Sequence, residues 1–340
     1  MSETDTQNFL VVRLSSLGDV VHTLPAFAAL RESFPRAHID WVVDQRWLGL
    51  AEMVTGIDQL IPLTRSPAGV LACVRRLRGA HYSCVVDFQG LYRSAVLARS
   101  SGAPRIIGFE RTAAREPGAS FFYTERVLPR GVHVAEMNVD LAVRAGAAAP
   151  RTMQFPLRVP ENELRRVRET VSREGNADYV VLSPGGGWRS KCWTPDRYGA
   201  LCGELWRRHG LRAMINVSAS QGELAQSVLR AAGEANPLVV SPGLQELAAL
   251  LAGARLVVGA DTGPVHLAAA LGTRVVALFG PTDPARNGPL PRGAVLRNAA
   301  AEDSTYKRGK TYSATMLSVS VEQVLETAER EMSVAPSPPR

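Results

Sequence analysis

The sequence predicts two doubly wound α/β domains in one chain, each built on a parallel sheet. Short apolar runs alternate with amphipathic stretches long enough to form helices. The alternation is interrupted at residues 151–160, where Pro156 and Pro160 fall, and then starts again. Several of the apolar runs end in glycine-bearing loops that lead directly into a helix. Because ligands of this architecture bind at the carboxyl ends of the strands, we expect a site in a cleft between the two domains.

The first half of the chain contains five apolar runs of strand length. We predict strands at Phe9–Leu14, His38–Val43, around Ile61, Cys84–Phe88 and Arg105–Phe109. Helices are expected at about Val20–Ser33 and Ala68–Arg78, and from the Gln89-Gly90 turn to Arg99. The first helix stops before Pro35, since proline cannot continue a helix.

The second half repeats the pattern after a charged helix, Glu161–Glu174. Strands are predicted at Tyr179–Ser183, Ala213–Val217, Leu238–Ser241, Leu256–Gly259 and Val275–Phe279. Helices are predicted at Asp196–His209, Gly222–Ala232, Leu244–Ala252 and about Ser320–Met332. The domains are therefore expected to span 1–160 and 161–334, and the proline-rich tail 335–340 is expected to be disordered.

Length and composition favour a soluble, folded, cytoplasmic protein. The chain has 340 residues, of which 46% are hydrophobic, so each half can build a core. No apolar run approaches the ~18 residues of a membrane span, and the polar start, Met1–Asn8, predicts no signal peptide. The four cysteines are scattered without a CxxC pair, which is typical of reduced thiols and of neither a disulfide framework nor a zinc site.

The net charge of +7 limits the partners of the protein. A basic surface suits nucleic acid, anionic lipid, or a phosphorylated or carboxylated substrate. Because no block of basic residues with interleaved aromatics occurs, we expect no nucleic-acid binding. Only three of the 39 basic residues are lysines (Lys191, Lys307 and Lys310), so a lysine in a functional loop is informative.

The segment 255–284 gives the strongest indication of a ligand site. The apolar run Leu256–Val258 leads into a loop ending in Gly263, and Pro264 suits the first turn of a helix. Thr262 is a plausible N-cap of this helix, and Gly272 a plausible C-terminal stop. Free N–H groups and the helix dipole attract an anion there, and Asp261, Thr262 and His266 lie within one turn of that point. We predict a diphosphate and ribose site, although Asp261 as a structural carboxylate and His266 as a core histidine are the ordinary alternatives.

Two further loops follow strands in the same way. In the loop Ser15–Asp19, Asp19 can act as a general base, or it can simply cap the following helix. In the loop Ser183–Lys191, three glycines let backbone N–H groups approach a phosphate, and Lys191 supplies a charge. This loop is not a Walker A motif, and a flexible turn with a solvated lysine is its alternative reading.

Glu223 begins the predicted helix after the strand at 213–217. Its carboxylate can hold the two hydroxyls of a ribose, or it can be a helix-start carboxylate favoured by the dipole.

Three segments of the sequence resemble the ADP-heptose:lipopolysaccharide heptosyltransferases of glycosyltransferase family 9. They are RLSSLGDVVHTLPA at 13–26, SPGGGWRSKCW at 183–193 and GADTGPVHLAAALGTRVVALFGPTDP at 259–284. Within the family the chain looks most like heptosyltransferase I, on DWVVD at 40–44, DFQGLYRSA at 87–95 and AREPGASFFY at 114–123. The resemblance implies the GT-B fold, with an N-terminal acceptor domain and a C-terminal nucleotide-sugar domain. It also implies inverting transfer of a heptose from ADP-L-glycero-D-manno-heptose to a Kdo residue of Kdo-lipid A.

The resemblance also implies roles for individual residues. Asp19 would deprotonate the acceptor hydroxyl. The donor would be bound by the loop and helix-start residues Gly186, Gly187, Lys191, Glu223, Asp261, Thr262, Gly263 and His266. The acceptor would be bound by Ser15, Arg65 and Arg115. No metal and no cofactor are expected, because Lys191 and helix N–H groups would neutralise the leaving ADP. The enzyme would be a monomer that associates peripherally with the cytoplasmic face of the inner membrane.

The sequence departs from the heptosyltransferase I pattern at Leu63–Gly69, which is shorter and poorer in charge than the usual basic cluster. The acceptor therefore stays open, and a heptosyltransferase II-like enzyme or another ADP-sugar transferase acting on a later core sugar is the alternative. A nicotinamide-dependent oxidoreductase is excluded because the first loop lacks G-x-G-x-x-G. A periplasmic sugar-binding protein is disfavoured because no signal peptide is predicted.

Overall fold

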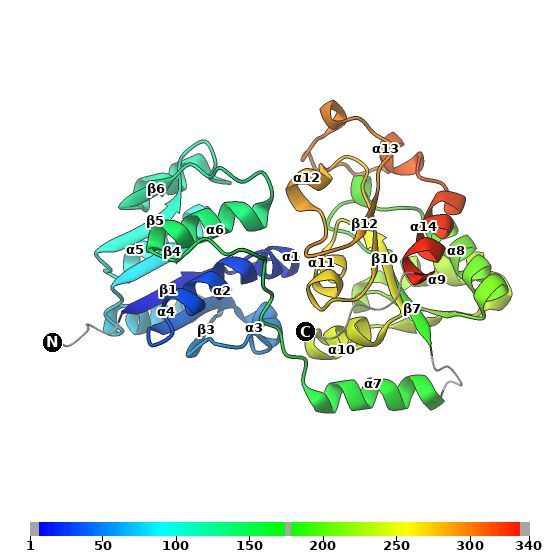
Figure 1. Cartoon of the computed structure of the whole chain (residues 1–340), viewed down its shortest axis with the longest axis horizontal. Helices are drawn as coiled ribbons and strands as arrows, with labels where there is room; N and C mark the ends of the chain where they lie inside the picture. The colour runs from blue at the N-terminus through cyan, green and yellow to red at the C-terminus, as the bar shows by residue number, and fades with distance from the viewer. Residues whose placement is uncertain (1–6, 174–177, 334–340) are drawn as a thin grey trace. The chain divides into compact units, whose positions relative to one another are not determined.

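The computed structural model describes residues 7–173 and 178–333, so the predicted disordered tail, 335–340, lies outside the described residues. The chain divides into two compact units, Met1–Arg158 (unit 1) and Val159–Arg340 (unit 2). The division falls two residues before the boundary that we expected after residue 160. Figure 1 shows a sheet with helices on both sides in each unit, and we describe the units separately.

Unit 1 is built on a six-stranded parallel sheet in the order β3-β2-β1-β4-β5-β6. The strands are β1 (Asn8–Val12), β2 (His38–Asp44), β3 (Gln59–Leu63), β4 (Cys84–Asp87), β5 (Arg105–Phe109) and β6 (Glu125–Val127). The chain adds strands outward in one direction from β1 and then in the other direction from β4. The loops after β1 and β4 therefore diverge at a topological switch point, where doubly wound sheets bind ligands.

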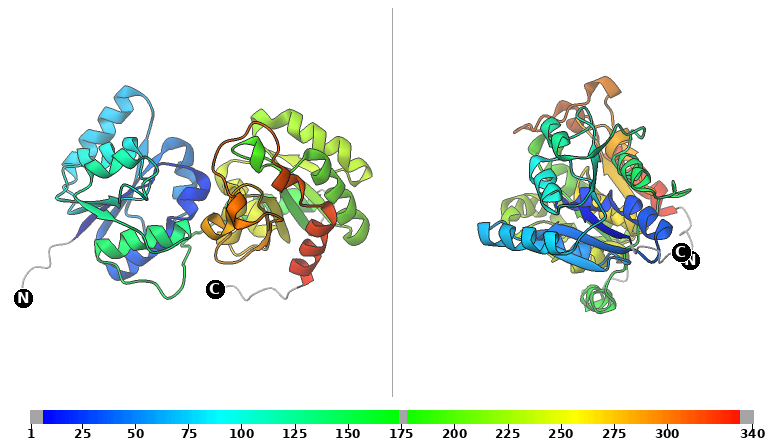
Figure 2. Two further views of the ribbon diagram at one scale, coloured as in Figure 1. Left: turned by 90° about the horizontal axis from the view of Figure 1, so that it is seen from above. Right: turned by 90° about the vertical axis from the view of Figure 1, so that its left-hand side faces the viewer.

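The helices of unit 1 cover both faces of this sheet (Figure 2). They are α1 (Leu17–Val21), α2 (Leu24–Ser33), α3 (Leu48–Ala51), α4 (Pro67–Gly79), α5 (Tyr92–Ser100) and α6 (Val134–Ala145), with 3-10 turns η1 (Gln45–Trp47) and η2 (Pro117–Phe122). Helices α4 and α5 share a buried cluster with Leu10, Val12 and Val85 of the sheet. Helix α2 packs against α6, and its Phe27 stacks on Trp41 with the ring centres 5.5 Å apart. Burial on both faces explains why the strands are continuously apolar.

Unit 2 repeats the same plan, with the strand order β12-β11-β10-β7-β8-β9. The strands are β7 (Tyr179–Ser183), β8 (Arg212–Asn216), β9 (Leu238–Val240), β10 (Leu256–Ala260), β11 (Val275–Leu278) and β12 (Ala294–Leu296). All are parallel, and β10 pairs directly with β7, so these two strands form the switch point of unit 2. The two parallel sheets confirm the predicted doubly wound α/β class.

The helices of unit 2 also cover both faces of its sheet. They are α7 (Glu161–Arg173), α8 (Pro195–His209), α9 (Gly222–Ala232), α10 (Leu244–Gly253), α11 (Gly263–Ala270), α12 (Pro284–Asn287), α13 (Ala314–Leu317) and α14 (Val321–Ser333). Helices α8, α9 and α14 share one buried cluster with alternate residues of the strands, such as Val180 and Leu182. Helix α10 packs against α7 and α11.

One predicted helix is wrong as a single element. The stretch expected as one helix over about 20–33 forms two, α1 and α2, with the break at His22 and Thr23. Pro25 explains the break, because it has no N–H to donate to the carbonyl four residues earlier. The Thr23 hydroxyl bonds to the Asp19 carbonyl at 2.9 Å. As a result, α1 is a short, separate helix that carries Asp19.

The sequence analysis predicted no helix or strand in residues 110–150, and no strand after Val275–Phe279. The structure places β6 and α6 in the former and adds β12 beyond β11. Strands β6 and β12 have only three residues each at a sheet edge, and none of these residues is fully buried.

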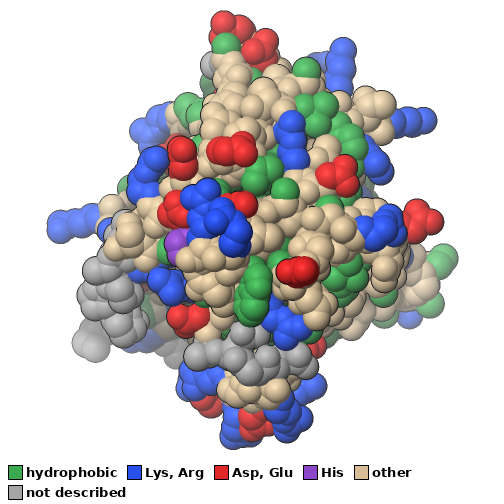
Figure 3. Space-filling view, turned by 90° about the vertical axis from the view of Figure 1, so that its right-hand side faces the viewer, with side chains coloured by type: hydrophobic (Ala, Val, Ile, Leu, Met, Phe, Trp, Pro, Cys, Tyr) green, Lys and Arg blue, Asp and Glu red, His purple; other side chains and the backbone are tan. Residues whose placement is uncertain are grey.

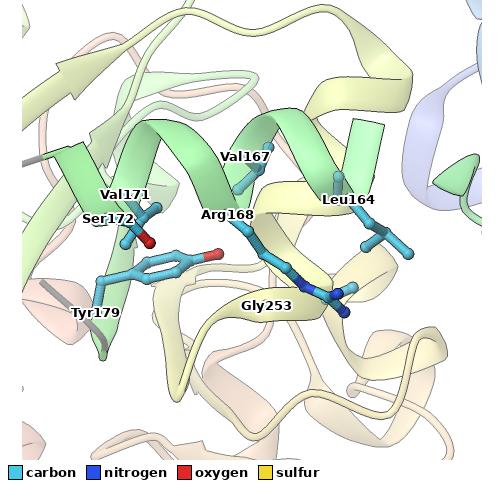
Figure 4. A pocket seen from close by; sticks show the side chains of 9 residues that line it. Leu164, Val167, Arg168, Val171, Ser172, Tyr179 and Gly253 are labelled. Carbon is cyan, nitrogen blue, oxygen red and sulfur yellow. The ribbon is translucent and has the colours of Figure 1, made fainter. Parts of the chain in front are cut away.

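A hollow of about 340 Å³ lies between α7 and α10. Figure 4 shows the Tyr179 ring beneath α7, with Val167 and Val171 above it. The Tyr179 hydroxyl donates to the Leu250 carbonyl at 2.7 Å, so it is already committed. Arg168 is the one charged side chain among the described lining residues. Since no polar groups converge there, the hollow is not a candidate site.

No helix in the described ranges is both long enough and apolar enough to cross a lipid bilayer.

Candidate active site

The candidate donor site lies at the switch point of unit 2. Strand β7 leads into the loop 184–191, and β10 leads into Asp261 and Thr262, with α11 beginning at Gly263. Thr262 is the N-cap residue of α11, and Gly272 follows the helix with φ +85°, as predicted. Gly259 allows the close packing of strand and helix, because a Cβ there would lie 2.8 Å from Val265 Cγ2. The two loops are adjacent because their strands are paired.

Three of the residues predicted to bind the donor lie close together at this switch point. Lys191 Nζ lies 2.5 Å from Asp261 Oδ2, and His266 Nε2 lies 3.0 Å from Asp261 Oδ1. The side chains of all three are less than a tenth exposed. The burial of His266 fits the alternative of a core histidine, but its ring bonds to the loop carboxylate and so also shapes the site.

The electrostatics of this cluster keep Asp261 ionised. Burial acts to raise the pKa of Asp261, but the hydrogen bond from His266 and the charge of Lys191 outweigh it and hold the pKa well below its usual range. Trp188 lies under the ammonium, with Lys191 Nζ 4.5 Å from the ring centre. The lysine is thus fixed and partly desolvated, contrary to the alternative of a solvated lysine.

The other predicted donor residues surround this cluster. At Gly186 a Cβ would lie 2.7 Å from Cys192 Sγ, so glycine allows the loop after β7 to fold back against Cys192. Gly187 has open space around it, so its lack of a side chain is not a packing requirement. Gly263, at the first position of α11, presents a backbone N–H that the helix does not use.

Glu223 is the predicted residue that the structure leaves apart. It is exposed in the first turn of α9, and no hydrogen bond or ion pair joins it to Lys191 or Asp261 in the parts of the chain that are described. The loop before it is nevertheless near, since a Cβ on Gly185 would lie 2.8 Å from the side-chain amide of Gln221. The position of Glu223 is compatible with a contact to a ribose. It is equally compatible with the alternative that Glu223 is only a carboxylate favoured by the dipole at the start of α9.

The candidate acceptor site lies at the switch point of unit 1, where Asp19 is held by four donors. Oδ1 faces Arg13 Nη2 at 2.8 Å, whereas Oδ2 accepts bonds from the Ser16 N–H and hydroxyl at 3.0 Å each. Arg115 Nη1 lies 3.3 Å from the same Oδ2. Asp19 is therefore the N3 carboxylate of a capping box, as one alternative proposed, and also part of a charged cluster that a cap does not require.

The two arginines decide the charge state of Asp19. Burial alone would raise its pKa, but the charges of Arg13 and Arg115 and the bonds from Ser16 hold the pKa far below its usual range. Asp19 is consequently ionised throughout the physiological range. Among the described residues only Arg13 bonds to Oδ1, so this oxygen retains a lone pair for a further donor.

Gln89 positions the loop that carries Asp19. It is 1% exposed, and its Oε1 accepts the Leu14 N–H at 2.7 Å and the Ser15 N–H at 3.3 Å. The second of these bonds holds the backbone of Ser15, which is one of the predicted acceptor-binding residues. Arg13 and Gln89 were missed by sequence reasoning, although a lone arginine at the end of an apolar strand was an available signal.

Arg65 belongs to a different cluster from Asp19 and Arg115. Its Nε lies 3.0 Å from Asp44 Oδ2, which also faces Arg93 at 3.7 Å, and Asp44 Oδ1 faces Arg46 at 3.0 Å. Burial raises the pKa of Asp44, but the bonds from Arg46 and Arg65 lower it to about 2. The cluster is next to the Asp19 loop, since the Asp44 N–H donates to the Leu14 carbonyl at 3.1 Å. Arg93 was not predicted from the sequence.

No group of three or more His, Cys, Asp or Glu side chains that could hold a metal ion occurs in the described residues. Positive charge in the candidate donor site comes from the Lys191 ammonium and from the N-terminus of α11.

Comparison with known proteins shows the family. The model of glycosyltransferase family 9 (heptosyltransferase) matches residues 70–315. Lipopolysaccharide heptosyltransferase 1 of Pseudomonas aeruginosa is 34% identical over 302 residues, which are 84% of this chain and 82% of that protein. The Escherichia coli heptosyltransferase WaaC with ADP is similar in structure, with a TM-score of 0.77 and 26% identity over 96% of this chain and 100% of that one. The same enzyme with ADP-2-deoxy-2-fluoro heptose gives a TM-score of 0.74 and 26% identity, covering 95% of this chain and 99% of that one.

Two doubly wound units, each with charged loops at its switch point, and this likeness to WaaC define a glycosyltransferase of the GT-B fold. The chain belongs to glycosyltransferase family 9, the heptosyltransferases, and the Pseudomonas relative supports the prediction that it is most like heptosyltransferase I.

Proposed function

We propose that the protein transfers a heptose from ADP-L-glycero-D-manno-heptose to a Kdo residue of the lipopolysaccharide inner core. The observation that carries this proposal is the cluster of Lys191, Asp261 and His266 beside the N-terminus of α11. The similarity to a lipopolysaccharide heptosyltransferase 1 and to a heptosyltransferase with ADP-2-deoxy-2-fluoro heptose supports both the donor and the pathway.

In this proposal unit 2 holds the donor. The Lys191 ammonium and the N–H groups of Thr262 and Gly263 bind the diphosphate, because a fixed cation and a helix N-terminus both favour an anion. Asp261 and His266 contact the heptose or its phosphate, and Glu223 contacts the ribose. Gly186 and Gly187 give the diphosphate access to backbone N–H groups.

Unit 1 in this proposal holds the acceptor and the base. Arg115 and Arg65 bind the carboxylate of the Kdo acceptor, together with Ser15. The acceptor hydroxyl donates to Asp19 Oδ1 and gives up its proton to that carboxylate. Its oxygen attacks the anomeric carbon from the side opposite ADP, the bond to ADP breaks, and the configuration inverts. Lys191 and the start of α11 neutralise the charge that develops on ADP.

The basicity of Asp19 depends on its arginines in this scheme. An ion-paired carboxylate with a low pKa is a weak base, so proton transfer is favoured when Arg115 turns from Asp19 to the acceptor carboxylate. Arg115 is suited to this exchange because its side chain is 53% exposed, whereas Arg13 is 3% exposed.

Acceptor choice is the finer part of the proposal, and a heptosyltransferase II-like enzyme acting on a later core sugar is the alternative. We also propose that the enzyme acts as a monomer at the cytoplasmic face of the inner membrane.

The test is a matrix of donors and acceptors, read by the rate of ADP release from purified protein. We expect ADP-L-glycero-D-manno-heptose with a Kdo-terminated acceptor to give the highest rate. Heptose-terminated acceptors and ADP-glucose serve as the comparison arms. Faster release with the heptose-terminated acceptor would assign the protein to a later step, and release that no acceptor stimulates would refute transfer altogether.

A further inference from the structure

The outer surface of helices α4 and α5 exposes apolar side chains that the proposed reaction does not use. Val70 and Leu71 on α4 are 40% and 49% exposed, and Tyr92 and Val96 on α5 are 51% and 49% exposed. We call these four residues, with the groove between the two helices, the α4–α5 surface. Exposed apolar side chains on neighbouring elements are typical of an interaction site.

The groove itself is a hollow of about 390 Å³ bordered by α4, α5 and the end of β3. Its apolar lining comes from Leu63 at the end of β3 and from both helices, namely Val70, Val74, Tyr92, Val96 and Leu97. Arg65 and Arg93 also line it. An apolar trough with guanidinium groups at its edge suits a ligand with an apolar chain and an anionic head.

The charge of this part of the chain is strongly one-sided. Between Gln59 and Phe109 the sequence has seven arginines and a single acidic residue, Asp87. Asp87 is fully buried and bonds to Ser94 and Tyr123, so it contributes no negative charge to the surface. Of the bordering carboxylates, Glu125 is paired with Arg105, whereas Glu116 accepts the Tyr92 N–H and leaves one negative charge at the start of α5. The arginines of the segment are Arg65, Arg75, Arg76, Arg78, Arg93, Arg99 and Arg105.

The helical face of unit 2 seen in Figure 3 has a different character, because positive and negative side chains are intermixed there. On α8, Arg207 and Arg208 pair with Glu204, and Arg208 also pairs with Glu329 of α14. Trp206 of α8 is 44% exposed beside these pairs. It therefore matches the α4–α5 residues in exposure but not in the charge around it.

The α4–α5 surface adjoins the edge of the sheet that carries the candidate acceptor site. Arg65 and Arg93 line the groove and also face Asp44 at the carboxyl end of β2. Asp44 in turn bonds through its backbone to Leu14, in the loop that leads to Asp19. A lipid seated at the groove would thus have its head group on the side of unit 1 where the acceptor hydroxyl is needed.

We propose that the α4–α5 surface docks unit 1 on an anionic lipid bilayer, with an acyl chain in the groove and the arginines of this segment other than Arg65 on the lipid phosphates. This inference rests on the proposed function, in which the acceptor is a membrane lipid. The physical basis is that apolar side chains enter the acyl boundary while each arginine near an anionic surface adds to the attraction. The cationic, carboxylate-free face of the two helices selects an anionic bilayer over a neutral one.

The test is co-sedimentation of the full-length chain with vesicles of phosphatidylcholine containing phosphatidylglycerol, compared with pure phosphatidylcholine. We expect binding to the anionic vesicles and at least tenfold weaker binding to the neutral ones. The double variant Leu71→Ser, Val96→Ser should lower the partition coefficient on anionic vesicles at least tenfold. The matched variant Trp206→Ser should leave it within twofold of the native value.

Activity on a water-soluble acceptor from which the acyl chains have been removed serves as the second readout. The double variant should retain native activity there, which shows that it is folded, and should lose activity on the intact acceptor in vesicles. Loss of vesicle binding by Trp206→Ser to the same extent would overturn the proposal. The proposal would also be overturned if the double variant and the native chain bound anionic vesicles equally well. It would fail as well if the native chain bound no vesicles, which would mean that the surface serves another partner. Native vesicle binding without any transfer to the soluble acceptor would refute the proposed function and leave the docking surface in place.

Discussion

Asp19 is surrounded by more positive charge than the cap of a short helix needs. A capping box is complete with Ser16 and Asp19 alone, yet Arg13 is buried beneath the carboxylate and Arg115 reaches it from the segment after β5. Burying a guanidinium is costly unless it has a partner, so Asp19 also serves as the counter-ion of Arg13. Glu136 provides the comparison within unit 1, because it closes the capping box of α6 with bonds from the Val132 and His133 N–H groups and, among the described residues, pairs with no arginine.

At the residue scale, we therefore predict that Asp19→Asn lowers the turnover number by about 10²–10⁴-fold, the usual contribution of a general base. The amide keeps the shape of the carboxylate but cannot take the proton. Affinity for ADP, measured by titration calorimetry, should stay within twofold because the donor site belongs to unit 2. Glu136→Gln is the control: it should cost stability as a weakened cap and leave turnover near native. If the two variants lowered turnover equally, Asp19 would be a cap and nothing more.

At the scale of elements, the loop between β1 and α1 depends on a glutamine from the next strand. Gln89 follows the carboxyl end of β4. Its side-chain oxygen accepts hydrogen bonds from the backbone N–H groups of Leu14 and Ser15. Its own N–H donates to Asp87 Oδ1 at 2.9 Å, and burial raises the pKa of that carboxyl. The switch point is thus held together by side-chain bonds across two adjacent strands, where the ladder of main-chain bonds has ended.

We predict that Gln89→Met lowers the free energy of unfolding by about 1–3 kcal/mol, because it leaves two N–H groups without an acceptor. Turnover should fall at least tenfold because the loop that positions Asp19 is loosened, whereas the affinity for ADP should not change. Gln323→Met is the matched control, since Gln323 Oε1 accepts the Ser320 N–H at the start of α14. It should cost stability without lowering turnover. Native turnover in Gln89→Met would show that the loop holds its shape without this glutamine.

At the scale of the whole molecule, each unit has its own sheet, its own core and one half of the proposed site. The cluster of Lys191, Asp261 and His266 lies entirely within unit 2, and the cluster of Arg13, Asp19 and Arg115 entirely within unit 1. Donor binding should consequently be a property of unit 2 alone, whereas transfer should need both.

We predict that a fragment of residues 159–340 folds and binds ADP within about threefold of the affinity of the full chain. Circular dichroism checks its fold, and titration calorimetry measures the affinity. Lys191→Ala in the fragment should weaken binding about 10–100-fold, since a charged hydrogen bond contributes about 1.5–3 kcal/mol. Lys307→Ala, which removes an exposed lysine, should have no effect. A folded fragment that fails to bind ADP would show that unit 1 contributes to the donor site.

The sequence by itself determined the doubly wound architecture, because strands buried on both faces must be continuously apolar and must alternate with amphipathic helices. It also predicted the loop at 259–263 and singled out Lys191 as a candidate ligand-binding residue, since glycine, a helix start and a rare lysine are visible without coordinates. The tertiary structure alone decided which side chains meet: Lys191 with Asp261, Arg115 with Asp19, and Arg65 with Asp44. In the described part of the chain it leaves Glu223 apart from all of these. Strand order sets these pairings, and strand order depends on long-range packing that no local pattern of residues records.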